Sequence, residues 1–544
     1  MGFSPIQGVK TFFTNLKNAP DNQYTTSAAA PMSLPPTNLT RWETSTSIEK
    51  KEMLMQSASA ASSTVSLPLG AEEKKKKGSN ILDAIVRAAG SRWTLGITFL
   101  LLIAWGVWGI VGGPTDTWQV ILQDVSSIQA YFSATLLLRQ QQGSCKDILG
   151  RICSLMSRGE SNERMLGALP SAERERLRTK KQVRMRNEIF DSMQTKEGIM
   201  DRVANAVSAA VGSLYFLAIY WAGIITWIVW GVPLQFSNTW QLYVNTATAL
   251  QITVTTMFLQ NIRKQHDQHL AKCIENIDML DKEIETELRL LTGDTKPNPV
   301  IASSPPTLTR MQKGIDIYAF IVGGSIGLVI SAAVFTVWAA IGHQLEFDDN
   351  WWLIIGTYTG LIGFIDSFIM KNVDYRETEL AKQHFQRLME QDYQLFKLLD
   401  AEMPPAEGSD ENADRKIPLG LRLSNAVGDF CATTGASYSA VGCVVALLVV
   451  ASAMQWTETG QLLCNTPTMI VEGFLLIMLL QAHNFADGRR RIVHDDILRR
   501  RIAMQGYLTS SSGAARVEPP APVYVVNTDE EKRASAQAAS GYNV

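Results

Sequence analysis

The stretch FSNTWQLYVNTATALQITVTTMFLQNIR, from Phe236 to Arg263, is long enough for a helix that crosses a bilayer, and it carries no charged side chain before Arg263. It nevertheless contains Gln241, Asn245, Gln251 and further amides, together with six threonines. A polar group in hydrocarbon costs free energy unless it finds a partner. The stretch therefore predicts a membrane helix whose amide and hydroxyl groups face something other than lipid.

The rest of the chain of 544 residues alternates long apolar runs with stretches rich in charged residues. Each apolar run is followed, after a short gap, by a second one. The first runs of the four pairs are Leu95 to Val111, Val211 to Val232, Ile317 to Ile341 and Val441 to Met454. All eight stretches are close to the ~20 residues that a helix needs to cross a bilayer. We therefore expect an all-α polytopic membrane protein with eight transmembrane helices.

Basic residues are absent from the gaps within the pairs, which are residues 113–117, 231–239, 342–350 and 455–462. The connections between the pairs and the two tails carry all 50 Lys and Arg residues. The positive-inside rule then places both termini and the three long connections in the cytosol. The gaps are acidic instead, with Asp116, Glu346, Asp348, Asp349 and Glu458.

The pairs of runs are also repeats of one another. Residues 90–109 align with residues 212–231, and the same shift places Trp118 on Trp240 and Gln129 on Gln251. A third copy aligns with Trp352 under Trp240, and a fourth, after a deletion of two residues, places Gln461 there. This pattern predicts four parallel two-span hairpin repeats around an axis along the membrane normal. By analogy with tetrameric channels, a central path would lie between them.

Each second span is expected to continue into the cytosol as a helix of a bundle, because apolar residues recur at steps of three and four after Arg263. The predicted organisation is a disordered cytosolic tail (1–78), hairpin 1 (79–142), a cytosolic helical connection (143–200), hairpin 2 (201–265), a cytosolic helix and linker (266–312), hairpin 3 (313–374), a second helix and linker (375–420), hairpin 4 (421–486), a basic cytosolic helix (487–505) and a disordered tail (506–544).

Several polar residues fall at membrane depth in the second spans. Eleven residues inward from the outer tryptophan, or its equivalent, the alignment gives Gln129, Gln251, Gly363 and Glu472, at ~16 Å in a core of ~30 Å. Carboxylates at this depth are expensive unless they line water or meet a cation. We therefore predict a path for a cation, with metal-contacting residues Asp124, Gln129, Asn245, Gln251, Asp366, Glu472 and His483.

Other interpretations of these residues stay open. Gln129 and Gln251 are also suited to hydrogen bonds between helices, and Asp124 to capping a helix near the outer headgroups. The segment His266-x-x-His269-x-x-x-Cys273 has helical metal-ligand spacing, although a solvated helix face is the commoner reason for such a pattern. Oxygen ligands suit hard or borderline divalent metals, and His and Met widen the range toward iron, zinc and copper. Because no compact ligand motif is present, we expect weak affinity and broad selectivity.

The stretches Trp118 to Gln141 and Phe236 to Asp267 resemble the fungal low-affinity iron permease family, and the resemblance extends over roughly residues 80–505. It implies a plasma-membrane permease for ferrous iron that also accepts other divalent metals such as copper and zinc.

The function expected from the sequence is low-affinity uptake of divalent metal cations, driven by the electrochemical gradient, because no nucleotide-binding motif is found. We expect no enzymatic activity, no resident cofactor and no nucleic-acid partner. The divalent metal is the cargo, the lipid bilayer is a partner, and a homo-oligomer is left open. The alternative is a membrane-anchored scaffold or regulator that acts through its cytosolic helical bundle.

Overall fold

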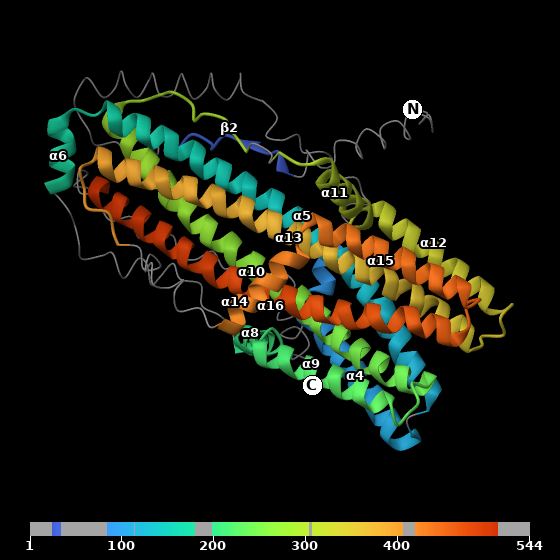
Figure 1. Cartoon of the computed structure of the whole chain (residues 1–544). Helices are drawn as coiled ribbons and strands as arrows, with labels where there is room; N and C mark the ends of the chain where they lie inside the picture. The colour runs from blue at the N-terminus through green and yellow to red at the C-terminus, as the bar shows by residue number, and fades with distance from the viewer. Residues whose placement is uncertain are drawn as a thin grey trace, which may run out of the picture.

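The computed structural model describes residues 24–33, 84–113, 115–179, 199–303, 307–405 and 419–509. Within these ranges the protein is almost entirely helical, as predicted. Four long helices run side by side through the molecule (Figure 1). The longest has 55 residues, or about 80 Å at 1.5 Å per residue. The four are α5 (Asp116–Ala168), α10 (Asn238–Thr292), α13 (Asp349–Leu398) and α16 (Glu458–Thr509).

The four long helices form a square. Helix α5 packs against α10 and α13, and α16 packs against the same two, so that α5 and α16 lie diagonally opposite. The order around the axis is therefore α5, α10, α16, α13, which differs from the order along the chain. Many polar side chains of the four long helices are buried in this bundle, among them Gln123, Asn245 and Asn465.

Four shorter, apolar helices surround one end of this bundle, which we call the eight-helix end: α4 (Arg92–Gly112), α9 (Leu214–Gly231), α12 (Ser325–Gly342) and α15 (Thr434–Ala453). Most of their apolar side chains are exposed, for example Trp93 at 84% and Tyr215 at 84%. Such a surface fits lipid and does not fit water.

Six helices in the described part of the chain are long and apolar enough to cross a membrane: α4, α9, α12, α13, α15 and α16. The sequence predicted eight spans. Helices α5 and α10 are not among the six, because amides and hydroxyls interrupt the apolar residues in their first halves. Length alone does not distinguish them, since both exceed 50 residues.

Stacked tryptophans join three of the short helices to the long helices that follow them. The ring centroids of Trp227 and Trp240 are 3.9 Å apart, and each indole N–H donates to the other residue's carbonyl at 2.8 Å. The same arrangement joins Trp105 to Trp118 and Trp338 to Trp351. The predicted alignment of Trp352 with Trp240 is therefore wrong by one residue.

The fourth repeat is shifted in the same way. The backbone N–H of Phe236 donates to Gly231, that of Phe347 to Gly342, and that of Trp456 to Ala451. These three aromatic residues therefore correspond, and Gly460, not Gln461, takes the place of Trp240. Apolar spans supply few distinctive letters, so the sequence did not fix this register.

Three short helices that the sequence analysis did not predict precede the later short spans: α8 (Ile199–Val211), α11 (Arg310–Val322) and α14 (Leu419–Cys431). They lie beside the middle of the long bundle, where the eight-helix end gives way to the long helices alone (Figure 1). A small helix α6 (Ser171–Thr179) caps the opposite end.

Beyond the short helices the four long helices continue alone, and we call this part the four-helix end. Its core is apolar, with Ile152, Ile274, Leu388 and Ile497 all buried. Buried ion pairs cross this core, among them Arg501 with Asp281 and Asp392 at 3.1 and 2.8 Å. The expected cytosolic extension of the second spans corresponds in position to these helices.

A segment near the N-terminus packs against the four-helix end. Strand β1 (Ser27–Ala28) pairs antiparallel with β2 (Ile301–Ala302), and Tyr24 is only 1% exposed. The prediction that residues 1–78 form a disordered tail is therefore wrong for residues 24–33. The other residues predicted as tails lie outside the described residues, namely 1–23, 34–78 and 510–544. Residues 506–509, which were also predicted as part of a tail, form the end of α16.

Candidate functional site

The facing sides of the four long helices form successive layers along the axis of the eight-helix end. The outermost is an apolar cluster with one residue from each helix: Val120, Leu242, Leu353 and Leu462. Three residues further along each helix, on the same face, lies a polar layer: Gln123, Asn245, Gly356 and Asn465. We call this the amide layer. Six to ten residues beyond the apolar cluster, the same helices enclose a small cavity.

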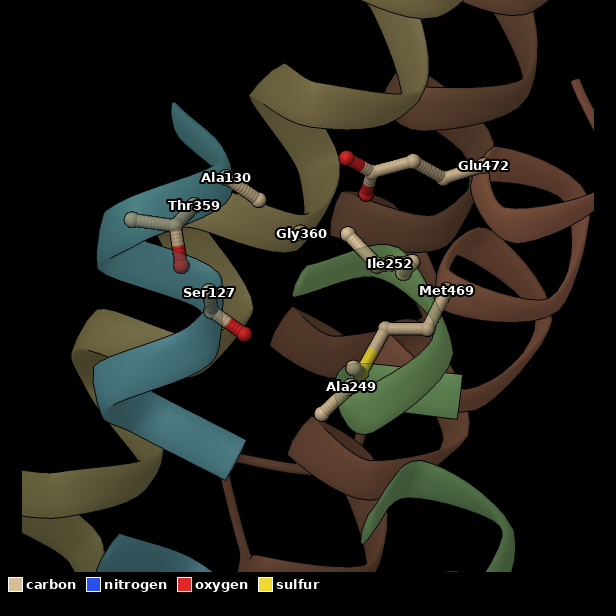
Figure 2. Close-up of a pocket in the computed structure, with 8 residues that line it drawn as sticks. All are labelled: Ser127, Ala130, Ala249, Ile252, Thr359, Gly360, Met469 and Glu472. Atoms are coloured by element: carbon tan, nitrogen blue, oxygen red, sulfur yellow. The ribbon is translucent and has the colours of Figure 1, made fainter. Parts of the chain in front are cut away.

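The cavity has a volume of about 10 Å³, which is room for roughly one water-sized particle. It is lined by two residues from each long helix: Ser127, Ala130, Ala249, Ile252, Thr359, Gly360, Met469 and Glu472. Figure 2 shows the carboxylate of Glu472 extending from α16 into the space between the helices. Of these eight side chains, Glu472 alone is charged.

The carboxylate of Glu472 fits because α13 has a glycine beside it. A Cβ atom on Gly363 would lie 2.6 and 2.7 Å from the two carboxylate oxygens, closer than real contacts allow. Glu472 is 5% exposed and accepts no hydrogen bond from the described residues. A buried carboxylate without a partner requires a cation or a proton. The cavity is therefore suited to a small cation.

Glycines on α13 also accommodate polar groups of the amide layer. A Cβ atom on Gly356 would lie 2.7 Å from Oδ1 of Asp124 and 3.7 Å from Nδ2 of Asn465. One turn inward, a Cβ atom on Gly360 would clash with Oδ1 of Asn465. These side chains come from α5 and α16, the two helices that lie diagonally across the bundle. Oxygen atoms from opposite helices thus meet at the glycine face of α13.

Two of the predicted site residues, Gln129 and Gln251, do not line the cavity of Glu472. Gln129 hydrogen-bonds Ser133 at 3.1 Å and faces a separate cavity against α4. Gln251 donates to Thr255 at 2.9 Å and to the carbonyl of Gly473 at 3.3 Å. The corrected register explains this, because Ala130 and Ile252 correspond to Glu472. The prediction placed both glutamines at the level of Glu472 on the axis, and this was wrong by one residue.

The other predicted residues lie at several levels. Asp124 and Asn245 belong to the amide layer region and are 1% and 0% exposed. Asp366 is completely buried one turn inward from Gly363, and it accepts a hydrogen bond of 2.8 Å from the hydroxyl of Tyr318 on α11. This carboxylate is therefore held beside the axis and is not among the residues that line the cavity. Metal binding by any of these residues remains a prediction.

His483 lies at the inner end of the apolar part of the bundle. Its Nε2 is 3.0 Å from Nδ1 of His266, whose other nitrogen is 3.4 Å from Asp487. Arg263 pairs with Asp374 at 2.6 Å on the same level. The described residues contain no cluster of three or more His, Cys, Asp or Glu side chains arranged to hold a metal ion. His269 and Cys273 contact each other at 3.5 Å.

The sequence analysis missed Gln123 and Asn465 and the role of the α13 glycines. The signal was present in the pattern GTYTGLIG, residues 356–363, which places three glycines on one helix face at spacings of four and three. The alignment of the first two copies already places Gln123 on Asn245, and Asn465 would have joined them if the fourth copy had been aligned one residue earlier.

Comparison with known proteins gives consistent results. The family described as low affinity iron permease matches residues 200–286, 314–398 and 421–510. A fission yeast (Schizosaccharomyces pombe) protein named low-affinity iron/zinc ion transport protein fet4 is 39% identical over 428 residues, covering 78% of this chain and 72% of the relative. A budding yeast (Saccharomyces cerevisiae) protein named low-affinity Fe(2+) transport protein is 35% identical over 458 residues, covering 78% and 82%. No solved structure matches this chain.

Proposed function

Because the chain belongs to the low affinity iron permease family, we propose that it carries divalent iron into the cell along the axis of its four long helices. It is a multi-pass membrane protein that transports metal ions with low affinity, and it is not an enzyme. The name of one relative adds zinc as a second cargo. We include copper as a further cargo, because side chains with oxygen, nitrogen and sulfur atoms occur together along the bundle.

We propose that the membrane contains eight spans arranged as four parallel hairpins. Helices α4, α9, α12 and α15 are the first spans, and the first halves of the long helices are the second spans. Helices α5 and α10 need no high hydropathy, because their polar groups face other helices and not lipid. The four-helix end is then the cytosolic extension. The basic residues of the connections support this orientation in the plasma membrane, with both termini in the cytosol.

The observation that carries the proposal is the unpaired carboxylate of Glu472 in a cavity at the centre of the bundle. A divalent cation that enters this cavity has lost most of its water and needs replacement oxygens. Glu472 supplies a charged oxygen, and Ser127 and Thr359 supply hydroxyls on the opposite side. A helix that served only to anchor a scaffold would not need such a group, so we set the scaffold alternative aside.

Entry needs no primary pump. An inside-negative potential favours a divalent cation by about 4.6 kcal/mol per 100 mV. This corresponds to an accumulation of roughly 2,000-fold at equilibrium, which is ample for uptake at low affinity.

The test is Fe²⁺ uptake by cells that express the wild type or Glu472→Gln. The glutamine keeps the size but removes the charge, so we expect the maximal rate to fall by about tenfold or more and the half-saturation concentration to rise, at equal abundance in the membrane. Glu379→Gln is the control, because Glu379 lies on the surface of the four-helix end, where its side chain is 46% exposed. Unchanged uptake by Glu472→Gln would exclude a path through the cavity.

A further inference from the structure

We propose that the amide layer, with Asp124 beside it, is a second cation-binding site, where a divalent metal exchanges part of its water for protein oxygens and is selected before it reaches Glu472. The site consists of Gln123 and Asp124 from α5, Asn245 from α10 and Asn465 from α16, around Gly356 of α13. This inference rests on the proposed function, since it assigns the step that precedes the central cavity.

The side chains of this site converge on one point. Gln123, Asp124 and Asn465 all have a polar atom within 3.7 Å of the position that a Cβ atom on Gly356 would occupy. Asn245 lies at the same level on α10, which packs between α5 and α16. Gly356 is therefore the position at which a fourth side chain is absent, and Oδ1 of Asp124 reaches the place that its Cβ atom would take.

These polar groups are buried and have no partner among the described residues. Gln123, Asp124 and Asn465 are each 1% exposed and Asn245 is 0% exposed. Both polar side-chain atoms of each of the four residues lack a hydrogen bond within the described part of the chain. Buried polar atoms nearly always have partners, because an unmade hydrogen bond costs about 1–3 kcal/mol. Eight unpaired atoms at one level indicate a ligand.

Hydrogen bonds that merely hold helices together look different in this protein. Asn261 donates to the carbonyl of Gly90 at 3.2 Å, and Asn372 donates to the carbonyl of Ala432. These two packing amides each have a partner in another segment of the chain, which the four polar side chains of the proposed site do not.

The next turn inward continues the supply of oxygen atoms. Thr248, Thr359 and Thr468 occupy the same position on α10, α13 and α16, and each donates its hydroxyl hydrogen to a carbonyl of its own helix at 2.8–3.1 Å. With the hydrogens committed to the backbone, the free lone pairs of these hydroxyls are available as electron donors. Hydroxyl and amide oxygens together suit a hard or borderline divalent cation.

The charge and position of the site suggest its role. One carboxylate and three neutral amides bind more weakly than several carboxylates would, which suits a site that must release its ion. Asn465 is seven residues before Glu472 on α16, or ~10 Å along the helix. A cation can therefore pass from the amide layer to the cavity in a single step. Because amide ligation depends on ion size and preferred geometry, the amide layer is where metals should be distinguished.

The experiment compares the uptake of Fe²⁺, Zn²⁺ and Mn²⁺, each supplied alone, by cells that express Asn245→Ala, Asn465→Ala or Glu472→Gln. We expect the two asparagine variants to change the ratio of Fe²⁺ to Zn²⁺ or Mn²⁺ uptake by about threefold or more. Glu472→Gln should lower the uptake of all three metals by a similar factor. The matched control is Asn261→Ala, which removes a buried, hydrogen-bonded amide from α10 away from the amide layer and should preserve the ratios.

The two proposals fail in different ways. If Glu472→Gln leaves uptake unchanged, the proposed path is wrong. If Glu472→Gln lowers uptake but the asparagine variants keep wild-type ratios, the path stands and the selective site is overturned. Asn465→Asp covers the case in which the alanine variants do not reach the membrane. It retains an oxygen and adds charge, so it should lower the half-saturation concentration for Zn²⁺, and an unchanged value would overturn the inference.

Discussion

At the scale of single residues, the glycines of α13 decide where oxygen atoms can gather. Gly356, Gly360 and Gly363 lie on the face of α13 turned toward the axis, and side chains from α5 and α16 fill the space beside them. A glycine in a helix interior costs about 1 kcal/mol relative to alanine. This cost is accepted where another group occupies the place of the missing Cβ atom.

The first prediction concerns Gly363→Ala. The added methyl group would lie 2.6 Å from the Glu472 carboxylate and force it to move. Because the site depends on the position of one charged side chain, Fe²⁺ uptake should fall by about tenfold with normal protein abundance. The control is Gly143→Ala, which adds the same methyl group to α5 with no atom within 4 Å. Equal uptake by the two variants would show that the position of Glu472 is unimportant.

The second prediction concerns the buried pair of carboxylates at the four-helix end. Burial raises the pKa of Asp281 from 3.8 to about 6, against the opposing effect of Arg501 and with a contribution from Asp392. An acid with a raised pKa stabilises the folded state at low pH, and this contribution is lost as the pH rises through about 6. Asp281→Asn removes that titration and leaves Arg501 paired with Asp392 at 2.8 Å.

Relative to the wild type, Asp281→Asn should therefore gain stability between about pH 5 and pH 7.5, by about 1 kcal/mol. The measurement is the melting temperature of the purified full-length protein at both pH values. Contributions from His494 and His384, whose pKa values are lowered by burial, are common to both proteins and cancel in the difference. A difference that is constant over this pH range would show that Asp281 does not titrate in the folded protein.

At the scale of elements, the ends of the helices are fixed by local signals. Ser91, Ser213 and Thr433 cap the first turns of α4, α9 and α15 with their side-chain oxygens, and Asp348 does the same for α13. At the other end, a stacked tryptophan pair, which we call the tryptophan clamp, joins each of α4, α9 and α12 to the long helix that follows. The fourth repeat lacks this clamp, since Gly460 occupies the position of Trp240.

The third prediction is that the tryptophan clamp supports folding and takes no part in transport. Trp227→Phe keeps an aromatic ring against Trp240 but leaves the carbonyl of Trp240 without its 2.8 Å donor. The free energy of unfolding should fall by about 1 kcal/mol, measured as a lower melting temperature. The half-saturation concentration for Fe²⁺ should stay the same.

Trp93→Phe is the control for the clamp, because Trp93 is 84% exposed on α4. It should preserve both the melting temperature and the uptake. If Trp227→Phe changed the half-saturation concentration as much as Glu472→Gln, the clamp would belong to the transport path.

At the scale of the whole molecule, apolar layers close the bundle on both sides of the polar layers. Val120, Leu242, Leu353 and Leu462 form the outer layer. On the inner side, Leu137, Leu259, Met370 and Leu479 are 0–2% exposed. A cation does not cross such layers without water or ligands. The structure therefore represents a closed state, and transport requires the helices or their side chains to move.

The fourth prediction concerns the orientation of the whole chain. Tags placed at residue 1 and at residue 544 should both resist an external protease in intact cells, because the proposed topology, drawn from the basic residues, places both ends in the cytosol. A tag inserted after Gln344, between α12 and α13, is the positive control and should be cleaved. Cleavage of either terminal tag would overturn the topology of eight spans.

The sequence by itself determined the class of the protein and the chemistry of its axis. Apolar runs, the distribution of basic residues and the repeats predicted a helical membrane protein, and the comparisons confirmed a metal transporter of the predicted family. Glu472 was selected from its depth in the aligned repeats and Asn245 from its place in an apolar run, because a charged or amide side chain there needs an explanation that a membrane anchor does not give.

Only the tertiary structure decided which polar residues face one another. Successive side chains of an α-helix point in directions about 100° apart. The alignment error of one residue therefore placed Gln129 and Gln251 on the axis in the prediction, whereas in the structure they lie away from it. The order of the helices around the axis, α5, α10, α16, α13, brings Asp124 and Asn465 together across Gly356. Neither fact is carried by any local pattern, because both depend on how the four long helices pack.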